Sequence, residues 1–240
     1  MKVRGERECK DCGTRWSYYE TGGVDCPSCG SRRSVGVGER KQHTDAGGEL
    51  DLDDARQAAA DEPLRRAASA AEDACREYVQ SRGFISGGDL LDLDAAYVAA
   101  QELKHAAGTV AARLDLDDPE EAYVLTLLRG AEDGARPPAN EVPASLQSAR
   151  GLGAAAAVRA YRLDIRAYVD DPDTEEPAEA ARLVERLGDH EKRVRALDGD
   201  VEPEAADGLV DAARAVGRYV RDGTASTRAD ALDALDALDS

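Results

Sequence analysis

"CKDCGTRWSYYETGGVDCPSCG", residues 9–30, carries the pattern that decides the fold at the start of this chain. Cys9 and Cys12 are separated by two residues, as are Cys26 and Cys29, and thirteen residues lie between the pairs. Two residues between cysteines let both thiolates turn inward from one tight loop, and two facing loops make a tetrahedral cage of four sulfurs. The four cysteines are therefore candidate ligands of one metal ion.

The residues around the cysteines favour a small β-hairpin. A glycine follows each second cysteine, Gly13 or Gly30, and can adopt the positive φ that the chain needs as it leaves the loop. "TRWSYYE" (14–20) favours a strand, "TGG" (21–23) favours a turn, and "RSVGV" (33–37) is a candidate third strand. This head is too poor in apolar side chains to fold by burial alone. We expect structural zinc to supply its folding free energy, on the order of 10–16 kcal/mol.

The motif "CKDCG…CPSCG" around a short hairpin resembles a zinc ribbon, as found in transcription factor B, RNA polymerase small subunits and ribosomal proteins. The resemblance covers residues 7–38 and implies one closed, structural Zn²⁺ site. With "RGERECKDCGTRWSYYETG" (4–22) heading an acidic body, the whole chain also looks like haloarchaeal zinc-ribbon proteins of unknown function. Four sulfurs also suit the iron of a rubredoxin-like electron carrier. Rubredoxins usually separate their cysteine pairs by more than thirteen residues, so zinc is favoured.

Composition changes near residue 45. Residues 1–45 hold nine Lys and Arg against seven Asp and Glu, whereas residues 46–240 hold 22 against 42. We divide the chain into a zinc ribbon (1–42), a linker (43–52) and an acidic α-helical domain (53–240). The net charge of −18 and the scarcity of lysine resemble proteins of salt-loving archaea. At about 1 M salt the Debye length is only ~3 Å, so a partner would have to be held by direct contacts.

Beyond the linker the sequence predicts helices alone. Apolar residues recur at spacings of three and four, as at Leu183, Val184 and Leu187, and nothing between 50 and 240 alternates as a strand. Short connections indicate an all-α bundle of about six or seven helices. The predicted helices cover residues 53–81, 89–114, a short segment capped by Asp118 with Pro119 at its first position, 143–169, 177–197, 203–222 and the tail from 227.

Aromatic and basic residues of the head form a candidate binding surface. On a strand, Trp16 and Tyr18 would share one face and Tyr19 would take the other. Rings among arginines suit single-stranded nucleic acid, because every base has a face to stack. Alternatively, the rings pack the small core or dock the head onto the helices, and an exposed surface would suit a protein partner equally well. The candidate contact residues are Arg15, Trp16, Tyr18, Tyr19, Arg32 and Arg33.

Charge argues against a strong nucleic-acid patch. Four thiolates around Zn²⁺ carry a net −2, which cancels the small basic excess of the head, and the body is strongly acidic. The segment 149–197 is nearly neutral, and its basic residues could contact phosphate, although pairing with nearby acids is the simpler interpretation. These residues are Arg159, Arg162, Arg166, Arg182, Arg186, Lys192, Arg193 and Arg195.

No catalytic constellation is found. His43, His105 and His190 show no ligand spacing, and there is no nucleotide-binding loop and no nucleophile beside a histidine. "GLGAAAA" (151–157) follows no predicted strand and is interpreted as close helix packing, and Cys75 as a small buried apolar residue.

These observations predict a zinc-binding, non-catalytic protein. We expect an adaptor that docks on transcription or translation machinery, such as polymerase or ribosome components, through its ribbon and helical body. Direct RNA or DNA binding is the main alternative, and an iron electron carrier is a weaker one. "MKVRGERECKD" (1–11) lacks the apolar core of a signal peptide, and "AAAAV" (154–158) is too short to cross a bilayer. A cytoplasmic location is therefore expected.

Overall fold

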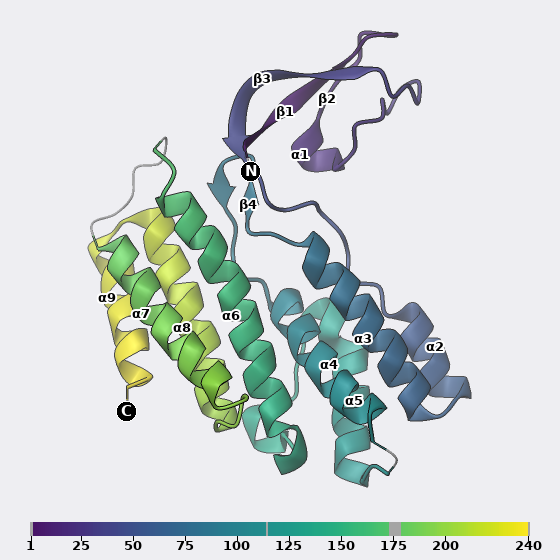
Figure 1. The fold of residues 1–240 in the computed structure, drawn as a ribbon, viewed down its shortest axis with the longest axis vertical. Coiled ribbons are helices and arrows are strands. Elements are labelled where there is room, and N and C mark those ends of the chain that lie inside the picture. The colour runs from purple at the N-terminus through teal and green to yellow at the C-terminus, as the bar shows by residue number, and fades with distance from the viewer. Residues whose placement is uncertain (1, 114, 173–178, 240) are drawn as a thin grey trace.

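The computed structural model describes residues 2–113, 115–172 and 179–239, and it consists of a small β-sheet head and a larger helical body (Figure 1). The head lies at one end of the body, above the C-terminal end of its long central helix. A small N-terminal sheet followed by a mostly helical body is the predicted fold class, which is confirmed.

The head is a three-stranded antiparallel sheet with the order β2-β1-β3. Its strands are β1 (Lys2–Cys9), β2 (Arg15–Ser17) and β3 (Ser34–Gln42). Strand β1 was not predicted, because its sequence "KVRGEREC" does not alternate apolar and polar residues. It forms because it is the central strand and pairs with a neighbour on each side.

The predicted strand over residues 14–20 is wrong beyond Ser17. The chain turns there into a short helix, α1 (Tyr18–Thr21), which ends at Gly22 with a φ of 61°. Trp16 and Tyr18 therefore do not share the face of one strand. Although they are only two residues apart, Trp16 lies in β2 and Tyr18 lies in α1.

The body contains eight further helices among the described residues, and most of the predicted ones are present. The long helices predicted over 143–169, 177–197 and 203–222 are observed within these ranges. The helices are α2 (Asp53–Asp61), α3 (Leu64–Ser81), α4 (Ala95–Ala111), α5 (Asp118–Gly130), α6 (Gln147–Val169), α7 (Ala180–Ala196), α8 (Pro203–Asp222) and α9 (Ala225–Ala237). Three 3₁₀ turns lie between α5 and α6 (Ala131–Asp133, Ala139–Glu141 and Ala144–Leu146).

The boundaries differ from the prediction at three places. Pro63 divides the helix predicted over 53–81, because proline has no N–H to donate and its ring clashes with the preceding turn. A two-stranded hairpin, β4 (Ile85–Ser86) and β5 (Asp89–Leu90), replaces the predicted start of the next helix. In α5 the cap is Asp117 rather than Asp118, and its carboxylate accepts from the amide of Glu120 at 2.9 Å.

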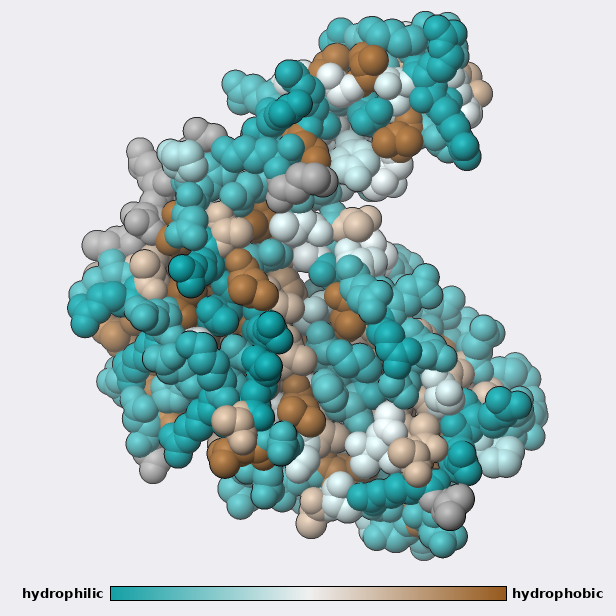
Figure 2. Space-filling view, in the orientation of Figure 1, coloured by the Kyte–Doolittle hydropathy of each residue, from teal (hydrophilic) through white to brown (hydrophobic). Residues whose placement is uncertain are grey.

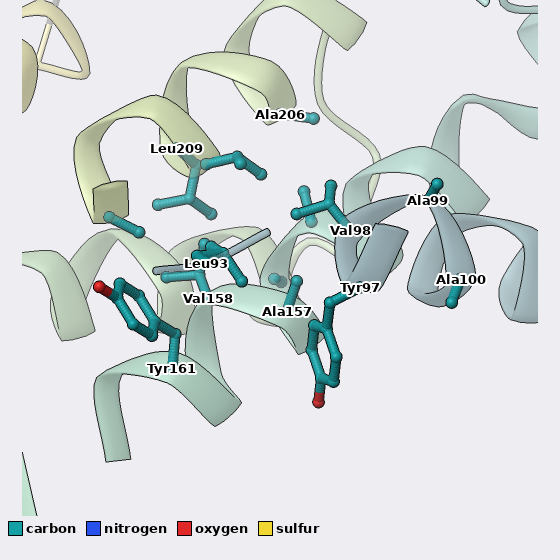
Figure 3. Packing of buried hydrophobic residues seen from close by; sticks show 14 of the residues in the cluster. Leu93, Tyr97, Val98, Ala99, Ala100, Ala157, Val158, Tyr161, Ala206 and Leu209 are labelled. Atoms are coloured by element: carbon teal, nitrogen blue, oxygen red, sulfur yellow. The ribbon is translucent and has the colours of Figure 1, made fainter. Parts of the chain in front are cut away.

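Helix α6 forms the centre of the body, between α4 on one side and α7 and α8 on the other (Figure 1). Figure 3 shows Val98 of α4, Val158 of α6 and Leu209 of α8 turned toward one another in the shared core. Close packing at the glycines of α6 is confirmed, with Gly151 against the turn at Gly199 and Gly153 against α4. A Cβ on Gly153 would lie 2.7 Å from the Cα of Glu102 in α4, so only glycine allows this approach.

The segment predicted as a linker is fixed against the body. The amide of Thr44 donates to the carbonyl of Ile85 at 2.8 Å, and its hydroxyl donates to Asp164 of α6 at 2.7 Å. The carboxylate of Asp45 forms an ion pair with Arg82 at 2.5 Å. His43 is buried. The head therefore joins the body through an ordered junction.

Candidate metal centre

The four cysteines of the head converge on one point. Their sulfur atoms all lie within 4.8 Å of one another, with Sγ–Sγ distances of 3.7 Å between Cys9 and Cys29 and 3.6 Å between Cys12 and Cys26. A tetrahedron of thiolates at the usual Zn–S distance of about 2.3 Å has edges of about 3.8 Å. The four sulfurs thus have the spacing of a metal cage.

The two cysteine loops have the same backbone geometry. The amide of Gly13 donates to the carbonyl of Cys9 at 3.0 Å, and that of Gly30 donates to Cys26 at 2.8 Å. In both loops the amide of the first cysteine donates to the carbonyl that follows the glycine, at 2.9 Å. The glycines have φ values of 74° and 70°, which side chains on L-residues disfavour. The loops are therefore two copies of one ligand-presenting turn.

The thiol cluster resists complete ionisation in the absence of a cation. Hydrogen bonding with Thr14 lowers the pKa of the Cys12 thiol to about 6. A backbone hydrogen bond at Ser31 lowers the pKa of Cys29, but crowding by Cys12 and the other thiols, together with burial, raises it to about 12. A divalent cation would offset the repulsion between neighbouring thiolates and so allow all four thiols to ionise. Four thiolates also complete a tetrahedral shell, which leaves no position for a reacting water, so the donor set is that of a structural site.

The three aromatic residues predicted as contacts all touch other parts of the protein. Tyr18 and Tyr19 are half-buried, and the centroids of their rings lie 5.8 and 4.8 Å from that of His43. Trp16 is only 8% exposed and packs with Cys9 and Cys26, and its indole N–H donates to the carbonyl of Gly23 at 3.3 Å. The hydroxyl of Tyr19 donates to the carbonyl of Val3 at 3.0 Å. These contacts match the alternative in which the rings form the core or dock the head.

The predicted arginine contacts lie on the surface in ion pairs. Arg15 pairs with Glu8 at 2.7 Å, and Arg33 pairs with Asp11 at 2.8 Å. Arg32 lies 3.7 Å from Asp25. Because these arginines are paired and Trp16 is buried, a joint contact surface of the six residues stays a prediction.

A basic groove, which sequence reasoning missed, lies where the sheet meets α1. It has a volume of about 380 Å³, and no carboxylate is among the described residues that line it. Arg4 and Arg7 would point to opposite faces of a regular strand, but the pairing of β1 with β3 shifts register beside Arg4. No sequence pattern signals this irregularity. The lining residues are Lys2, Val3, Arg4, Arg7, Tyr18, Val24, Gly36 and Arg40.

Most basic residues of segment 149–197 are paired with acids, as the simpler interpretation expected. Arg162 and Arg195 both bond to Glu191, at 3.4 and 3.2 Å. Arg186 reaches Asp236 at 2.7 Å and Asp239 at 2.5 Å. These pairs join α7 to α6 and to the C-terminal end of the chain. Lys192 lies 3.0 Å from Asp189, and Arg166 lies 3.7 Å from Asp170.

Cys75 is confirmed as a buried residue of the body. Its side chain is inaccessible to solvent, and burial raises the pKa of its thiol to about 12. It lies on α3, apart from the four cysteines of the head. The fifth cysteine therefore packs as a small apolar side chain.

Comparison with known proteins adds a family. The model of a family of unknown function, DUF7117, matches residues 1–235, which include both the head and the body. The chain belongs to this family. No curated protein and no solved structure matches the chain. The resemblance of the head to the ribbons of transcription factor B and polymerase subunits stays a prediction. Within the described ranges, no helix combines the length and apolar character that spanning a membrane requires.

Proposed function

We propose that Cys9, Cys12, Cys26 and Cys29 hold one structural Zn²⁺ ion in a protein without catalytic activity. The observation that carries this proposal is the closed sulfur cage, whose Sγ–Sγ distances of 3.6 and 3.7 Å suit zinc thiolate coordination. Iron would use the same four donors, so the identity of the metal has to be measured.

Native mass spectrometry and elemental analysis of the purified full chain test the metal. We expect one zinc per chain and a colourless protein. A red protein containing iron would replace this proposal with electron transfer. Cysteines joined as disulfides, or a chain without any metal, would remove the proposed site altogether.

We further infer that the protein is an adaptor that docks on a protein of the transcription or translation machinery. The resemblance of the head to zinc ribbons of that machinery supports this class of partner. A second support is an apolar furrow on the body, with a volume of about 350 Å³. It follows one face of α6, where Leu152, Ala156, Ala160 and Leu163 recur at helical spacings. Figure 2 shows apolar residues gathered along α6, between α4 and α7.

An amphipathic helix of the partner with one carboxylate opposite Arg159 would fit this furrow. Small residues between two leucines let a helix approach closely, and apolar side chains of that helix would lie between them. Arg159 lines the furrow and has no hydrogen bond or ion pair within the described part of the chain. Nε2 of His105 is buried there without a hydrogen-bond partner in the described residues. Acidic side chains of a partner would complement this unpaired arginine.

Affinity purification of furrow variants tests the docking. Leu163 and Leu197 are 49% and 48% exposed, but only Leu163 lines the furrow, so Leu197→Asp is a matched control for Leu163→Asp. We expect a polymerase or ribosome component to be recovered with the wild type and the control, and lost with Leu163→Asp. The adaptor proposal fails if both variants retain that protein, or if only nucleic acid is recovered.

A further inference from the structure

We propose that the basic groove of the head binds single-stranded nucleic acid, with arginines on the phosphates and Tyr18 against a base. This site lies on the sheet and is independent of the furrow on α6. It also differs from the surface expected from the sequence, because Trp16 is buried and the hydroxyl of Tyr19 donates to Val3, whereas Tyr18, half-buried with its ring edge-on to His43 at 5.8 Å, lines the groove.

Positive charge is concentrated in this groove. Arg4, Arg7, Arg40 and Lys2 contribute to its lining, and none of its described lining residues is a carboxylate. Asp171 pairs with Lys2 at 2.8 Å from outside the lining, so the three arginines carry the positive charge of the groove. The rest of the chain is negatively charged, since the whole molecule carries a net charge of −18. An anionic ligand would therefore be attracted to this groove and repelled by most of the remaining surface.

The groove is partly preorganised for an anion. The guanidinium of Arg7 donates to the hydroxyl of Ser34 at 3.0 and 2.9 Å, which fixes its direction. Arg4 donates to the carbonyl of Gly38, which fixes a second guanidinium. Arg40 is exposed at the mouth. Holding the cationic groups in place lowers the entropy cost of binding.

Apolar and aromatic groups beside the arginines favour nucleic acid over an acidic peptide. Val24 is 47% exposed, and both it and Tyr18 line the groove. Flat bases can stack on such a ring at the same time as the phosphates meet the arginines. An acidic peptide would form ion pairs with the arginines, but its carboxylate side chains would make no stacking or apolar contact with Tyr18 and Val24. A volume of about 380 Å³ suits part of a strand rather than a duplex.

Fluorescence anisotropy with labelled oligo(U) and oligo(dT) tests the site on the zinc-loaded full chain between 50 and 200 mM KCl. Arg4→Gln and Arg40→Gln should each weaken binding and reduce the slope of log K against log salt by about one. Tyr18→Ala should weaken binding about tenfold, whereas Tyr18→Phe keeps the ring and should bind as the wild type does. Arg66→Gln on α3 is the control, because the Arg66 side chain is 77% exposed and far from the head in the chain.

Three results would overturn the site. One is no binding at 50 mM KCl by protein that retains one zinc and native circular dichroism. Another is equal weakening by Arg66→Gln, which would indicate a general charge effect. The third is equal affinity for a polyglutamate peptide with the same dependence on Arg4 and Arg40, which would assign the groove to acidic peptides. Metal content is measured in every variant, so loss of the zinc site is recognised separately.

Discussion

At the residue scale, His105 carries a pH dependence of stability. Burial, assisted by Lys104, lowers the pKa of His105 from 6.5 to about 4. Above pH 6.5 the imidazole is neutral in both the folded and unfolded states. Between pH 6.5 and 4 the unfolded chain binds the proton more readily, so this residue destabilises the fold progressively, by up to about 3 kcal/mol.

His105→Gln should therefore flatten the acid side of the stability profile. Urea unfolding of both proteins at pH 7 and pH 4.5 measures the difference. Both chains carry the same carboxylates, so we expect the wild type to lose about 2 kcal/mol more than the variant on acidification. Parallel losses would show that protonation of His105 is not opposed by the fold.

A buried ionic network is the second feature at this scale. Arg150 of α6 is 2% exposed and reaches Glu102 of α4 at 3.1 Å and Asp207 of α8 at 2.6 Å. Arg136 contributes a second bond to Glu102 at 2.7 Å. The hydroxyl of Tyr123 donates to the same carboxylate. The sequence does not reveal this network, because its members are far apart along the chain and resemble the many other charges.

Removing one member of this network should lower the free energy of unfolding, because the buried charges that remain lose a partner. Arg150→Ala leaves the buried Glu102 with Arg136 as its remaining cation and removes the bonds from α6 to Asp207, and we expect a loss of about 3 kcal/mol in the free energy of unfolding. Arg166→Ala is the control on the same helix. Its side chain is 67% exposed and lies 3.7 Å from Asp170, so it should cost at most about 1 kcal/mol. Equal losses in chemical denaturation would contradict the assignment of the network as a buried unit.

At the scale of elements, the contact between α4 and α6 depends on glycine. A Cβ on Gly153 would meet the backbone of Glu102, which cannot move without shifting α4. Gly153→Ala should therefore lower the free energy of unfolding by about 1–3 kcal/mol despite its better helix propensity. Gly208→Ala in α8 makes the same change where the new Cβ meets only the tip of Leu238, at 3.3 Å. It should stabilise by up to about 1 kcal/mol. Thermal unfolding of both variants should show shifts of opposite sign.

Most elements could be predicted because they have local signals. Helices α6 and α8 follow from apolar residues at spacings of three and four, and the cysteine cage follows from the spacing of its ligands. Strand β1 carries no alternation, since it is stabilised by its two neighbours rather than by an apolar face. The strand predicted over 14–20 is present at Arg15–Ser17 and wrong beyond it, because Tyr18 and Tyr19 have high strand propensity, yet tertiary contacts favour a helical turn.

The binding surface could be predicted only in part. The number of arginines near the cysteines predicts a basic head. It does not predict which of these arginines lie together in the groove. The register shift beside Arg4 and the turn at Tyr18 together create the groove, and both depend on contacts between strands. Pairing of Arg15 with Glu8 likewise depends on the register of β1 and β2. Side-chain convergence is therefore set by tertiary structure.

At the scale of the whole molecule, the head and body have separate cores and an ordered junction. Cys9, Trp16 and Cys26 form the core of the head, whereas the body has its own large apolar cluster. Between them, the ring of His43 lies 4.8 Å from that of Tyr19, and the side-chain amide of Gln42 donates to the carbonyl of Ala167 at 2.8 Å. The polar and aromatic contacts of the junction are small beside the core of the body.

Loss of the metal should therefore unfold the head and spare the body. Cys12→Ser removes one of four ligands, and the head lacks a core large enough to compensate. Trp16 is the only tryptophan, so its emission reports on the head, while circular dichroism at 222 nm reports mainly on the helices. We expect loss of zinc and a red-shifted emission with most of the helical signal retained. Cys75→Ser is the control, since it lies in the body and should keep the metal and the native emission while lowering the melting temperature of the helices. If Cys12→Ser abolishes the helical signal as well, the junction couples head and body into one cooperative unit.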